Sequence, residues 1–453
     1  TASNLGSTGV GFYIIDNAAA RVYVVTEPVV LEELEPIELD PLVDLLRDGG
    51  KLQQLSPTFE ERQSQLDMLV SVGEAFNEER ICAAEAGTGV GKSFAYLIPA
   101  LAWAAQNQER VVVSTANINL QQQIYEKDIP QVRRLLGTDV KAALLKGRSN
   151  YLCLNRLEEA VEEDSLFDDS DDELAAIKRW AKETASGSRS DLPFPVSEQA
   201  WSRVNSDPDA CSGLRCRRRG DCFLLKARKQ AADARLLVVN HHLLFSDLSL
   251  RLRGMGFDNT AVLPAFHRLV FDEAHSVEDS ATSYFSESFS RFSVLKHLGR
   301  LSRQRRGRRL GLLPKLGSYT TKRTEEIDQA MADLREQVDT LETQVLPLLA
   351  EQGNLRMSAE LTEEQRDQVL EPIQELQSRL LSFVELVQDI VAAFEEHEDE
   401  TSDTHEIRGV LRRLGAISSL CESFRSYDSD PEQVYWIERR RTGNGDQFLR
   451  FTV

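Results

Sequence analysis

The chain has no apolar run long enough to cross a membrane and no secretory leader at its start. Cysteine is scarce, with six residues among 453, and in a chain of this kind we do not expect disulfides. The first residue is not methionine, which indicates an excised piece or missing upstream sequence. We therefore expect a cytoplasmic protein that has no membrane partner.

Net positive charge is also lacking, because the formal charge is −20. Taken alone, this balance argues against a nucleic-acid partner. The distribution says otherwise: residues 211–235 hold eight Lys or Arg against two Asp, and residues 300–309 hold six Arg. Much of the deficit lies in residues 158–173, which we interpret as a solvated or disordered insertion. The acidic total thus hides two basic patches.

The strongest positive signal is a glycine-rich stretch, Ala86-Gly87-Thr88-Gly89-Val90-Gly91-Lys92-Ser93. Glycines let successive backbone N–H groups turn toward phosphate oxygens, and the N-terminus of a following helix adds positive charge. Lys92 would hold the β and γ phosphates, and the Ser93 hydroxyl would bind Mg²⁺. An apolar run at 81–84 predicts a buried strand before the loop, and residues 94–105 predict a helix after it. Gly87 to Ser93 are therefore expected to bind a nucleoside triphosphate.

An acid pair follows a second apolar run, at residues 267–271. The sequence there is Asp272-Glu273-Ala274-His275, and ligands of open α/β sheets bind at the carboxyl ends of strands. Asp272 would hold Mg²⁺, mostly through water, and Glu273 would orient and deprotonate the attacking water. His275 would couple the nucleotide state to the rest of the protein. A lone acidic dipeptide is usually a solvated turn, but one that ends a buried strand favours a catalytic role.

Four cysteines lie between these two motifs: Cys153, Cys211, Cys216 and Cys222. Four thiolates in one cytosolic region indicate a metal site. Structural zinc usually uses pairs of cysteines that are closer together than most of these, and four-cysteine ligation serves zinc and iron–sulfur clusters alike. On the residues alone, the two metals stay about equally plausible.

The DEAH order of residues 272–275 resembles superfamily 2 helicases. The cysteine-rich insert between the loop and the acid pair resembles the XPD/DinG family of these helicases, whose members carry an iron–sulfur cluster there. The resemblance covers residues 56–453 and is carried locally by residues 144–153, 222–228 and 238–244. It implies that the four cysteines ligate a [4Fe–4S] cluster. It also implies that Arg62 and Gln65, in the segment 59–65, belong to an adenine-reading element.

The resemblance implies an α/β fold: a RecA-like P-loop motor domain 1 with a parallel sheet, an inserted iron–sulfur cluster domain and an inserted helical Arch domain. The expected divisions are an N-terminal segment with a β-hairpin (1–55), motor domain 1 (56–150 and 236–280, with a return at 434–453), the cluster domain (151–235) and the Arch domain (281–433). Apolar stripes at 327–348 and 369–394 independently predict an antiparallel helical hairpin.

For a complete bacterial relative, the resemblance implies ATP-driven 5′-to-3′ unwinding of DNA by a monomer. Its cofactors would be ATP, Mg²⁺ and the [4Fe–4S] cluster, and its substrates single-stranded and forked DNA. The family's Ser-Ala-Thr motif and motor domain 2 are not found in the 453 residues. We therefore expect this piece alone to bind single-stranded DNA weakly and to hydrolyse ATP poorly.

Candidate DNA contacts fall in three places. The first group follows the strand predicted at 111–115 and comprises Thr115, Asn117 and Gln121. The second lies beside the first cysteine and comprises Lys146, Arg148 and Tyr151. The third lies among the later cysteines and comprises Arg217, Arg218 and Arg219. Helix capping is an equal alternative for Thr115 and Asn117. Two other functional classes stay open: a nucleotide-gated single-stranded nucleic-acid binding module, and a zinc-stabilised NTPase.

Overall fold

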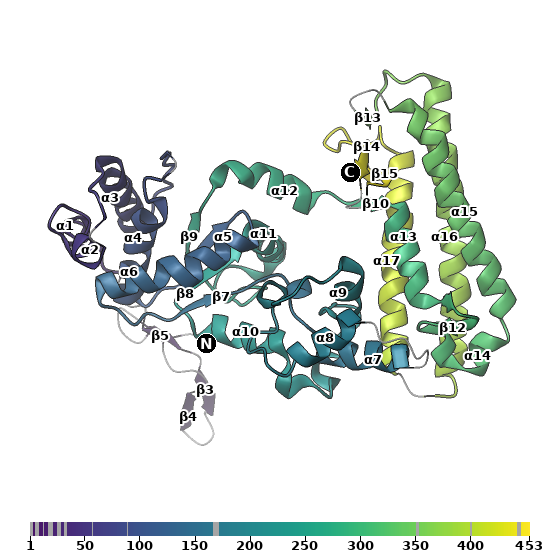
Figure 1. Ribbon diagram of the computed structural model, residues 1–453, viewed down its shortest axis with the longest axis horizontal. Coiled ribbons are helices and arrows are strands. Elements are labelled where there is room, and N and C mark those ends of the chain that lie inside the picture. The colour runs from purple at the N-terminus through teal and green to yellow at the C-terminus, as the bar shows by residue number, and fades with distance from the viewer. Residues whose placement is uncertain are drawn as a thin grey trace. The chain divides into compact units, whose positions relative to one another are not determined.

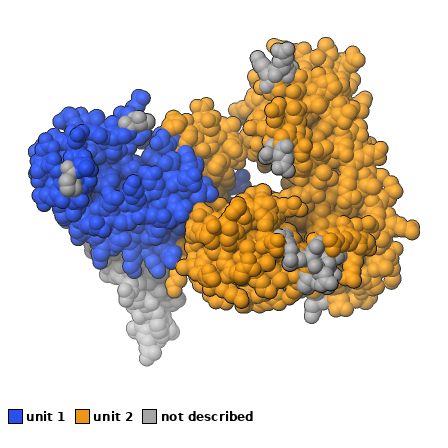
Figure 2. Space-filling model, viewed as in Figure 1, with its two compact units in different colours: residues 1–145, 230–240, 250–274 blue, residues 146–229, 241–249, 275–453 orange. Residues whose placement is uncertain are grey.

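The computed structural model describes residues 34–56, 58–87, 89–165, 172–349, 353–398, 401–441 and 445–453, together with five short strands before residue 34. The chain forms two compact units (Figures 1 and 2). Unit 1 comprises residues 1–145, 230–240 and 250–274, and unit 2 comprises residues 146–229, 241–249 and 275–453. Each unit is described by itself.

Unit 1 is built on a parallel sheet with the strand order β7-β8-β6-β9. Its strands are β6 (Val111–Thr115), β7 (Ala142–Leu144), β8 (Leu236–Asn240) and β9 (Arg268–Phe271). The valine and leucine runs of β6 and β8 are buried, as expected for a parallel sheet that is covered on both faces. The predicted α/β class with a parallel sheet is thereby confirmed.

Helices of unit 1 pack against this sheet and against one another. They are α1 (Asp40–Asp44), α2 (Lys51–Leu55), α3 (Gln63–Asn77), α4 (Lys92–Asn107), α5 (Ile118–Gln123) and α6 (Ile129–Leu136), with one π-helical turn at Ile124–Asp128 and another at Arg251–Met255. A shared apolar core joins α3, α4 and α6 to the strands. The helix predicted at 94–105 is confirmed as most of α4.

The strand predicted at 81–84 is wrong. Residues 80–87 carry no regular structure, and the Ile81 side chain is fully exposed. Among the described residues, β9 pairs only with β6, so this run gains no ladder hydrogen bonds along the sheet. The side chains of Cys82, Ala83 and Ala84 are small, so their burial would contribute little.

The strands before residue 34 are short. β1 (Ser3–Asn4), β2 (Gly9–Gly11) and β5 (Val29–Val30) form one sheet, and β3 (Tyr13–Asp16) pairs antiparallel with β4 (Arg21–Val24). The hairpin predicted from residues 9–27 corresponds to β3 and β4. Its turn at residues 17–20 and its end at 25–27 lie outside the described residues.

In unit 2, residues 275–453 form what we call the helical region. Its helices are α12 (Val277–Phe285), α13 (Arg291–Leu301), α14 (Ser318–Thr321), α15 (Thr324–Val345), α16 (Glu363–Glu395) and α17 (Ser402–Arg425). Figure 1 shows α15, α16 and α17 lying side by side. The apolar stripes expected at 327–348 and 369–394 line the buried core between them.

The pairing of α15 with α16 is antiparallel. The side chain of Gln368 donates to the carbonyl of Gln344, and that of Arg379 donates to the carbonyl of Asp333. The residue numbers of the partners on α15 therefore decrease as those on α16 increase, so the two helices are antiparallel. The predicted helical hairpin is confirmed. Helix α17, which also packs on α16, was not predicted.

Short strands complete the helical region. β10 (Ser288–Ser290), β13 (Asn354–Arg356), β14 (Trp436–Arg441) and β15 (Gln447–Thr452) form an antiparallel sheet in the order β10-β15-β14-β13, and β11 (Arg303–Arg305) pairs with β12 (Arg308–Leu310). Residues 434–453 were expected to return to motor domain 1. Their strands, β14 and β15, instead bond within this antiparallel sheet, where Phe451 stacks on Phe289.

Residues 146–229 of unit 2, which contain the four cysteines, form what we call the cysteine region. Its helices are α7 (Leu154–Ser165), α8 (Asp172–Trp180), α9 (Glu198–Val204) and α10 (Phe223–Asp233), the last running on past residue 229; α11 (His241–Leu250) follows β8. The acidic stretch 158–173 is helical up to Ser165 and from Asp172, and residues 166–171 lie outside the described part. Its described part is therefore neither disordered nor merely solvated.

The acidic stretch instead pairs with the basic run at 300–309. Arg303 bonds both carboxylate oxygens of Glu163, and Arg305 lies 2.9 Å from Asp164, which Arg203 also contacts at 2.8 Å. Asp164 is buried, and its arginine partners lower the pKa of its carboxyl against the opposing effect of burial. Two arginines of the basic run are thus structural partners of the acidic stretch inside unit 2.

His297 lies beside these charges and supplies a pH-dependent prediction. Burial first, then the positive charges of Arg413, Arg300 and Lys296, lower its pKa to about 4, while Asp209 opposes them. Its Nδ1 atom is buried without a hydrogen-bond partner in the described part of the chain, which suits a neutral ring. An unfolded histidine takes a proton near pH 6.5, so stability should fall as the pH drops from 6.5 toward 4, by at most ~3 kcal/mol.

The measurement is urea-induced unfolding at pH 7 and at pH 5 for the native chain and for His297→Gln. The native chain should lose more stability than the variant between these two pH values, because the glutamine has no proton to gain. An identical loss in both proteins would show that His297 does not contribute.

Candidate functional site

Two elements of unit 1 bring the motifs together. Asp272 directly follows β9, and its N–H donates to the carbonyl of Ser114 at 2.7 Å, which continues the ladder with β6. Lys92 begins α4, and its Nζ lies 3.5 Å from Oε1 of Glu273. The loop lysine and the acid pair therefore meet at the carboxyl edge of the sheet, where the sequence predicted them to meet.

Asp272 is held by a second strand end. The Thr115 hydroxyl donates to Oδ2 of Asp272 at 2.8 Å. Burial raises the pKa of the Asp272 carboxyl, and the charge of Glu273 adds to this, while the Thr115 hydrogen bond and Lys92 oppose it. Such a half-buried carboxylate between a hydroxyl and a cation suits a Mg²⁺ ligand, because oxygen donors are what Mg²⁺ prefers.

The predicted adenine-reading residues contact the glycine-rich loop itself. The Arg62 guanidinium donates to the carbonyl of Gly89, and the Gln65 amide donates to the carbonyl of Gly91 at 3.0 Å. Gly91 has φ 87°, and a Cβ there would lie 2.4 Å from the Gln65 amide nitrogen, so only glycine fits. Thr88 lies outside the described residues. The structure thus places both residues at the loop, and adenine recognition stays a prediction.

Sequence reasoning missed one carboxylate of this site. Asp128 ends the π-helical turn before α6 and is 5% exposed. Its carboxyl lies beside Ser93; burial raises the pKa of this carboxyl, the Ser93 hydroxyl and the charge of Lys127 oppose this, and the charge of Asp272 adds to it. The available signal was an acid in the apolar stripe Ile124, Asp128, Val132 at four-residue spacing.

The side chains after β6 that were predicted to contact DNA make hydrogen bonds within the protein. Thr115 is fully buried and serves Asp272, so its expected contact with a DNA backbone is corrected. Asn117 caps α5 by accepting from the N–H of Leu120 at 3.0 Å, which is the capping alternative. Gln121 is buried and donates to the carbonyl of Leu145.

The candidates beside the first cysteine are also largely internal. Lys146 is 4% exposed, and its ammonium donates to the hydroxyls of Ser188 and Ser190. Tyr151 is buried and accepts from the N–H of Lys146 at 3.1 Å, so neither side chain is presented to a nucleic acid. Arg148 is partly exposed and is the member of this group that remains available.

The later arginines lie on the surface of the cysteine region. Arg217 and Arg218 both pair with Glu158, at 3.3 and 2.9 Å, and Arg219 is exposed. Exposed pairs of this kind contribute little stability and exchange partners easily, so these side chains can turn to a phosphate.

The four cysteines all belong to the cysteine region. Burial raises the pKa of the Cys153 thiol most, and the charge of Cys216 adds to this. Cys211 and Cys222 both interact electrostatically with Arg228. Among the described residues, no three potential ligands are gathered closely enough to hold a metal. Four thiols are suitable donors for a metal cluster, but the described cysteines are not arranged as an assembled metal site.

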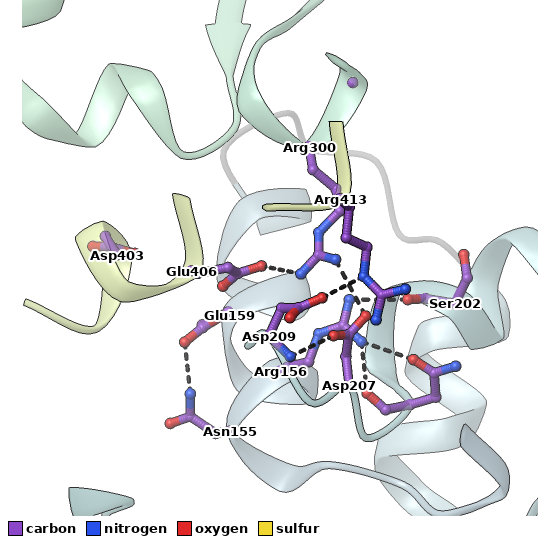
Figure 3. Close-up of polar contacts among 12 residues, drawn as sticks. Asn155, Arg156, Glu159, Ser202, Asp207, Asp209, Arg300, Asp403, Glu406 and Arg413 are labelled. Carbon is purple, nitrogen blue, oxygen red and sulfur yellow. Dashed lines mark hydrogen bonds and ion pairs between the residues drawn. The ribbon is translucent and has the colours of Figure 1, made fainter. Parts of the chain in front are cut away.

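A cavity of about 1540 Å³ opens in unit 2 between the cysteine region and the helical region. Ten cationic and five acidic side chains line it, which leaves an excess of positive charge. Figure 3 shows part of its wall, where Arg300 reaches both Asp207 and Glu406, and Arg413 reaches Asp209. Sequence reasoning did not predict this cationic cavity.

Comparisons with known proteins agree with the nucleotide motifs. Residues 68–162 match the DEAD/DEAH box helicase family. The chain is 38% identical to the ATP-dependent DNA helicase YoaA of Escherichia coli (strain K12) over 256 residues, which are 56% of this chain and 39% of YoaA. It is 38% identical to the ATP-dependent helicase DinG of Mycobacterium tuberculosis (strain ATCC 25618 / H37Rv) over 241 residues, 49% of this chain and 35% of that protein.

The chain therefore spans well under half the length of these curated relatives. A solved structure of a truncated XPD aligns with 83% of this chain and 84% of its own, at 14% identity and a TM-score of 0.35. No helix among the described residues is long and apolar enough to cross a membrane.

Proposed function

We propose that this chain, which carries a DEAD/DEAH box helicase domain and is homologous to the YoaA and DinG helicases, is the ATP-binding part of an ATP-dependent DNA helicase. One observation carries the proposal most strongly. Lys92 of the glycine-rich loop and Glu273 of the acid pair, 181 positions apart in the chain, lie 3.5 Å from each other at the carboxyl edge of a parallel sheet. That is the position at which such sheets bind nucleotides.

Each residue has a defined task in this proposal. The backbone N–H groups of Gly87 to Ser93 and the ammonium of Lys92 bind the phosphates. Bound Mg²⁺ would neutralise charge on the β and γ phosphates, with Ser93 and Asp272 as its protein ligands. Glu273 accepts the proton of the attacking water, and His275 links the site to the chain that follows it.

The direct test is binding of a fluorescent ATP analogue to the 453-residue chain. Lys92→Ala should weaken Mg²⁺–nucleotide binding at least about tenfold, because a charge-assisted contact worth about 1.5–3 kcal/mol is lost. Glu273→Gln should bind as well as the native chain, because this carboxylate does not hold phosphate. The matched control is Lys141→Ala, at an exposed lysine of unit 1. Equal affinity of the Lys92 variant and the native chain would refute the proposed site.

We also propose that Cys153, Cys211, Cys216 and Cys222 hold a [4Fe–4S] cluster. The support is the family resemblance of the cysteine region and its supply of four thiols, which are the ligands such clusters use. Bound there, the cluster would cross-link loops that have little regular structure of their own.

Anaerobic purification should give a brown protein with about four irons per chain. Cys153→Ser should lower the iron content and the visible absorption, whereas Cys82→Ser, at an exposed cysteine of unit 1, should change neither. A colourless protein that contains zinc would contradict the cluster and leave the ATP site untouched.

The DNA path is the remaining part of the proposal. A single strand would follow the cationic cavity between the cysteine region and the helical region, which the resemblance names the cluster and Arch domains. Backbone phosphates are attracted by such charge, and binding should weaken steeply with salt. For the complete protein we propose 5′-to-3′ movement on single-stranded or forked DNA. This chain alone, without a second motor domain, would bind DNA weakly and hydrolyse ATP poorly.

A further inference from the structure

Two carboxylates stand beside hydroxyl groups at the carboxyl edge of the sheet. Asp272 receives the hydroxyl of Thr115, at 2.8 Å. Asp128 lies beside Ser93, the other Mg²⁺ ligand of the proposed site. A serine hydroxyl binds a cation through its oxygen lone pairs, so its proton must point to an acceptor on the other side. Asp128 suits that role, because its carboxylate is buried beside Ser93, on the π-helical turn that packs against α4.

The position of Asp128 is set by an unusual piece of backbone. It is the last residue of a five-residue π-helical turn, Ile124–Asp128, which lies between α5 and α6. Turns of this kind are rare and are frequent at functional sites, because the extra residue re-aims the side chains that follow. Here Ile124 points into the core of unit 1 and Asp128, four residues later, is 5% exposed and meets Ser93 at the start of α4.

The buried hydroxyl of Tyr96 indicates that a further polar group binds beside Ser93. Tyr96 lies one turn after Ser93 on α4, is 2% exposed, and has Ser93, Asp272 and Asp128 as its polar neighbours. Among the described residues, its hydroxyl meets none of them with the geometry of a proper hydrogen bond. An unpaired buried hydroxyl costs about 1–3 kcal/mol, so a water or ion-bound water is its natural partner.

Charge points to a cation as the centre of this group. Asp128, Asp272 and Glu273 supply three carboxylates; Lys92 faces Asp272 and Glu273, and Lys127 is the cation near Asp128. A hard divalent cation that keeps several waters suits such a set of oxygen donors.

We propose that Asp128 is a positioning residue of the nucleotide site, which holds the Ser93 hydroxyl toward Mg²⁺ and, with Tyr96, orders a water bound to that ion. This inference rests on the proposed ATP site and adds a third carboxylate to it. Residues that orient metal ligands in this way typically change metal affinity by about 10–100-fold when they are replaced.

The test separates metal binding from nucleotide binding in the 453-residue chain. A fluorescent ATP analogue is bound in EDTA, and Mg²⁺ is then titrated. Asp128→Asn should raise the Mg²⁺ concentration at half-saturation by at least about tenfold while leaving affinity in EDTA unchanged. Glu126→Gln is the matched control, since Glu126 lies on the same turn, carries the same charge and is exposed. It should behave as the native chain does.

A double variant shows whether Asp128 acts through Ser93. If it does, Ser93→Ala and the pair Ser93→Ala with Asp128→Asn should share one Mg²⁺ midpoint. Should Asp128→Asn not fold, Asp128→Glu, which keeps the charge but moves it by one methylene, should show the same shift in smaller degree.

An Asp128→Asn midpoint equal to that of the native chain would overturn the inference. So would an equal loss of affinity with and without Mg²⁺, which is the mark of a purely structural residue. If the native chain bound no nucleotide under either condition, the proposed function would fail and this inference with it.

Discussion

Replacing Arg251 with methionine is expected to lower the free energy of unfolding of unit 1 by about 3–5 kcal/mol. Arg251 is 3% exposed, and its guanidinium organises the loop that follows it. It lies 5.5 Å from the ring of Phe257 and 4.9 Å from that of Phe266. It also donates, at 2.8–3.2 Å, to five backbone carbonyls, those of Gly256, Phe257, Asn259, Leu263 and Pro264. Methionine fills the space but satisfies no carbonyl.

Unfolding of unit 1 can be followed separately because Trp103 is its one tryptophan. In a background where the other three tryptophans are phenylalanine, urea titration of Trp103 fluorescence reports on this unit. The control is Arg253→Met, at an exposed arginine two positions along the same loop, which should change stability by no more than about 0.5 kcal/mol. A loss below 1 kcal/mol for Arg251→Met would show that the loop satisfies its carbonyls in another way.

Replacing Arg300 with methionine should cost unit 2 a similar 3–5 kcal/mol. Arg300 lies 3.2 Å from Asp207 of the cysteine region and 2.5 Å from Glu406 of the helical region, and all three side chains are at most 20% exposed (Figure 3). Both carboxylates raise the pKa of Arg300 against the effect of burial. Removing the guanidinium leaves two carboxylates close together and partly buried. Removing one partner of a buried ion pair destabilises a protein more than replacing both partners, because it leaves an uncompensated charge.

Trp201 is a suitable reporter for this change, because it is 1% exposed in α9 and its indole N–H donates to the carbonyl of Ser149. Urea unfolding followed at Trp201 alone measures the loss. Arg412→Met is the control: the Arg412 side chain is 63% exposed and its guanidinium lies 3.7 Å from Asp209, so a loss of at most about 1 kcal/mol is expected. The prediction fails if the Arg300 and Arg412 variants are equally stable.

The parts of this fold that sequence predicted are those fixed by local pattern. The stripes that include Ile327 and Leu376 repeat at helical spacing over many turns, and such periodicity survives any tertiary arrangement. The strands β6 and β9 were predicted for a similar reason, as apolar runs followed by polar motifs. The strand predicted at 81–84 was wrong because a four-residue strand depends on pairing with a neighbouring strand, and the local sequence does not say which strand lies beside it.

The candidate site divides along the same line. Lys92, Asp272 and Glu273 belong to motifs whose spacing carries their chemistry, so the sequence was sufficient to propose that they act together. Asp128 and Tyr96 belong to no motif: Tyr96 lies one turn after Ser93 on α4, and the packing of α4 against the π-helical turn brings Asp128 to the same place. Surface roles were harder still: Lys146 and Tyr151 looked available to DNA because burial is a property of the folded chain, not of the residue type.

The pairing of the acidic stretch with the basic run has a consequence for how these sequences can change over time. Glu163 and Arg303 are 140 positions apart, and Asp164 and Arg305 are 141 apart, yet each pair holds opposite charges together inside unit 2. Drift at one position is therefore constrained by its distant partner, and the two segments should covary as if they were adjacent. Substitutions that exchange both charges of a pair together should cost less stability than either substitution alone, so changes at this interface are expected to occur in pairs.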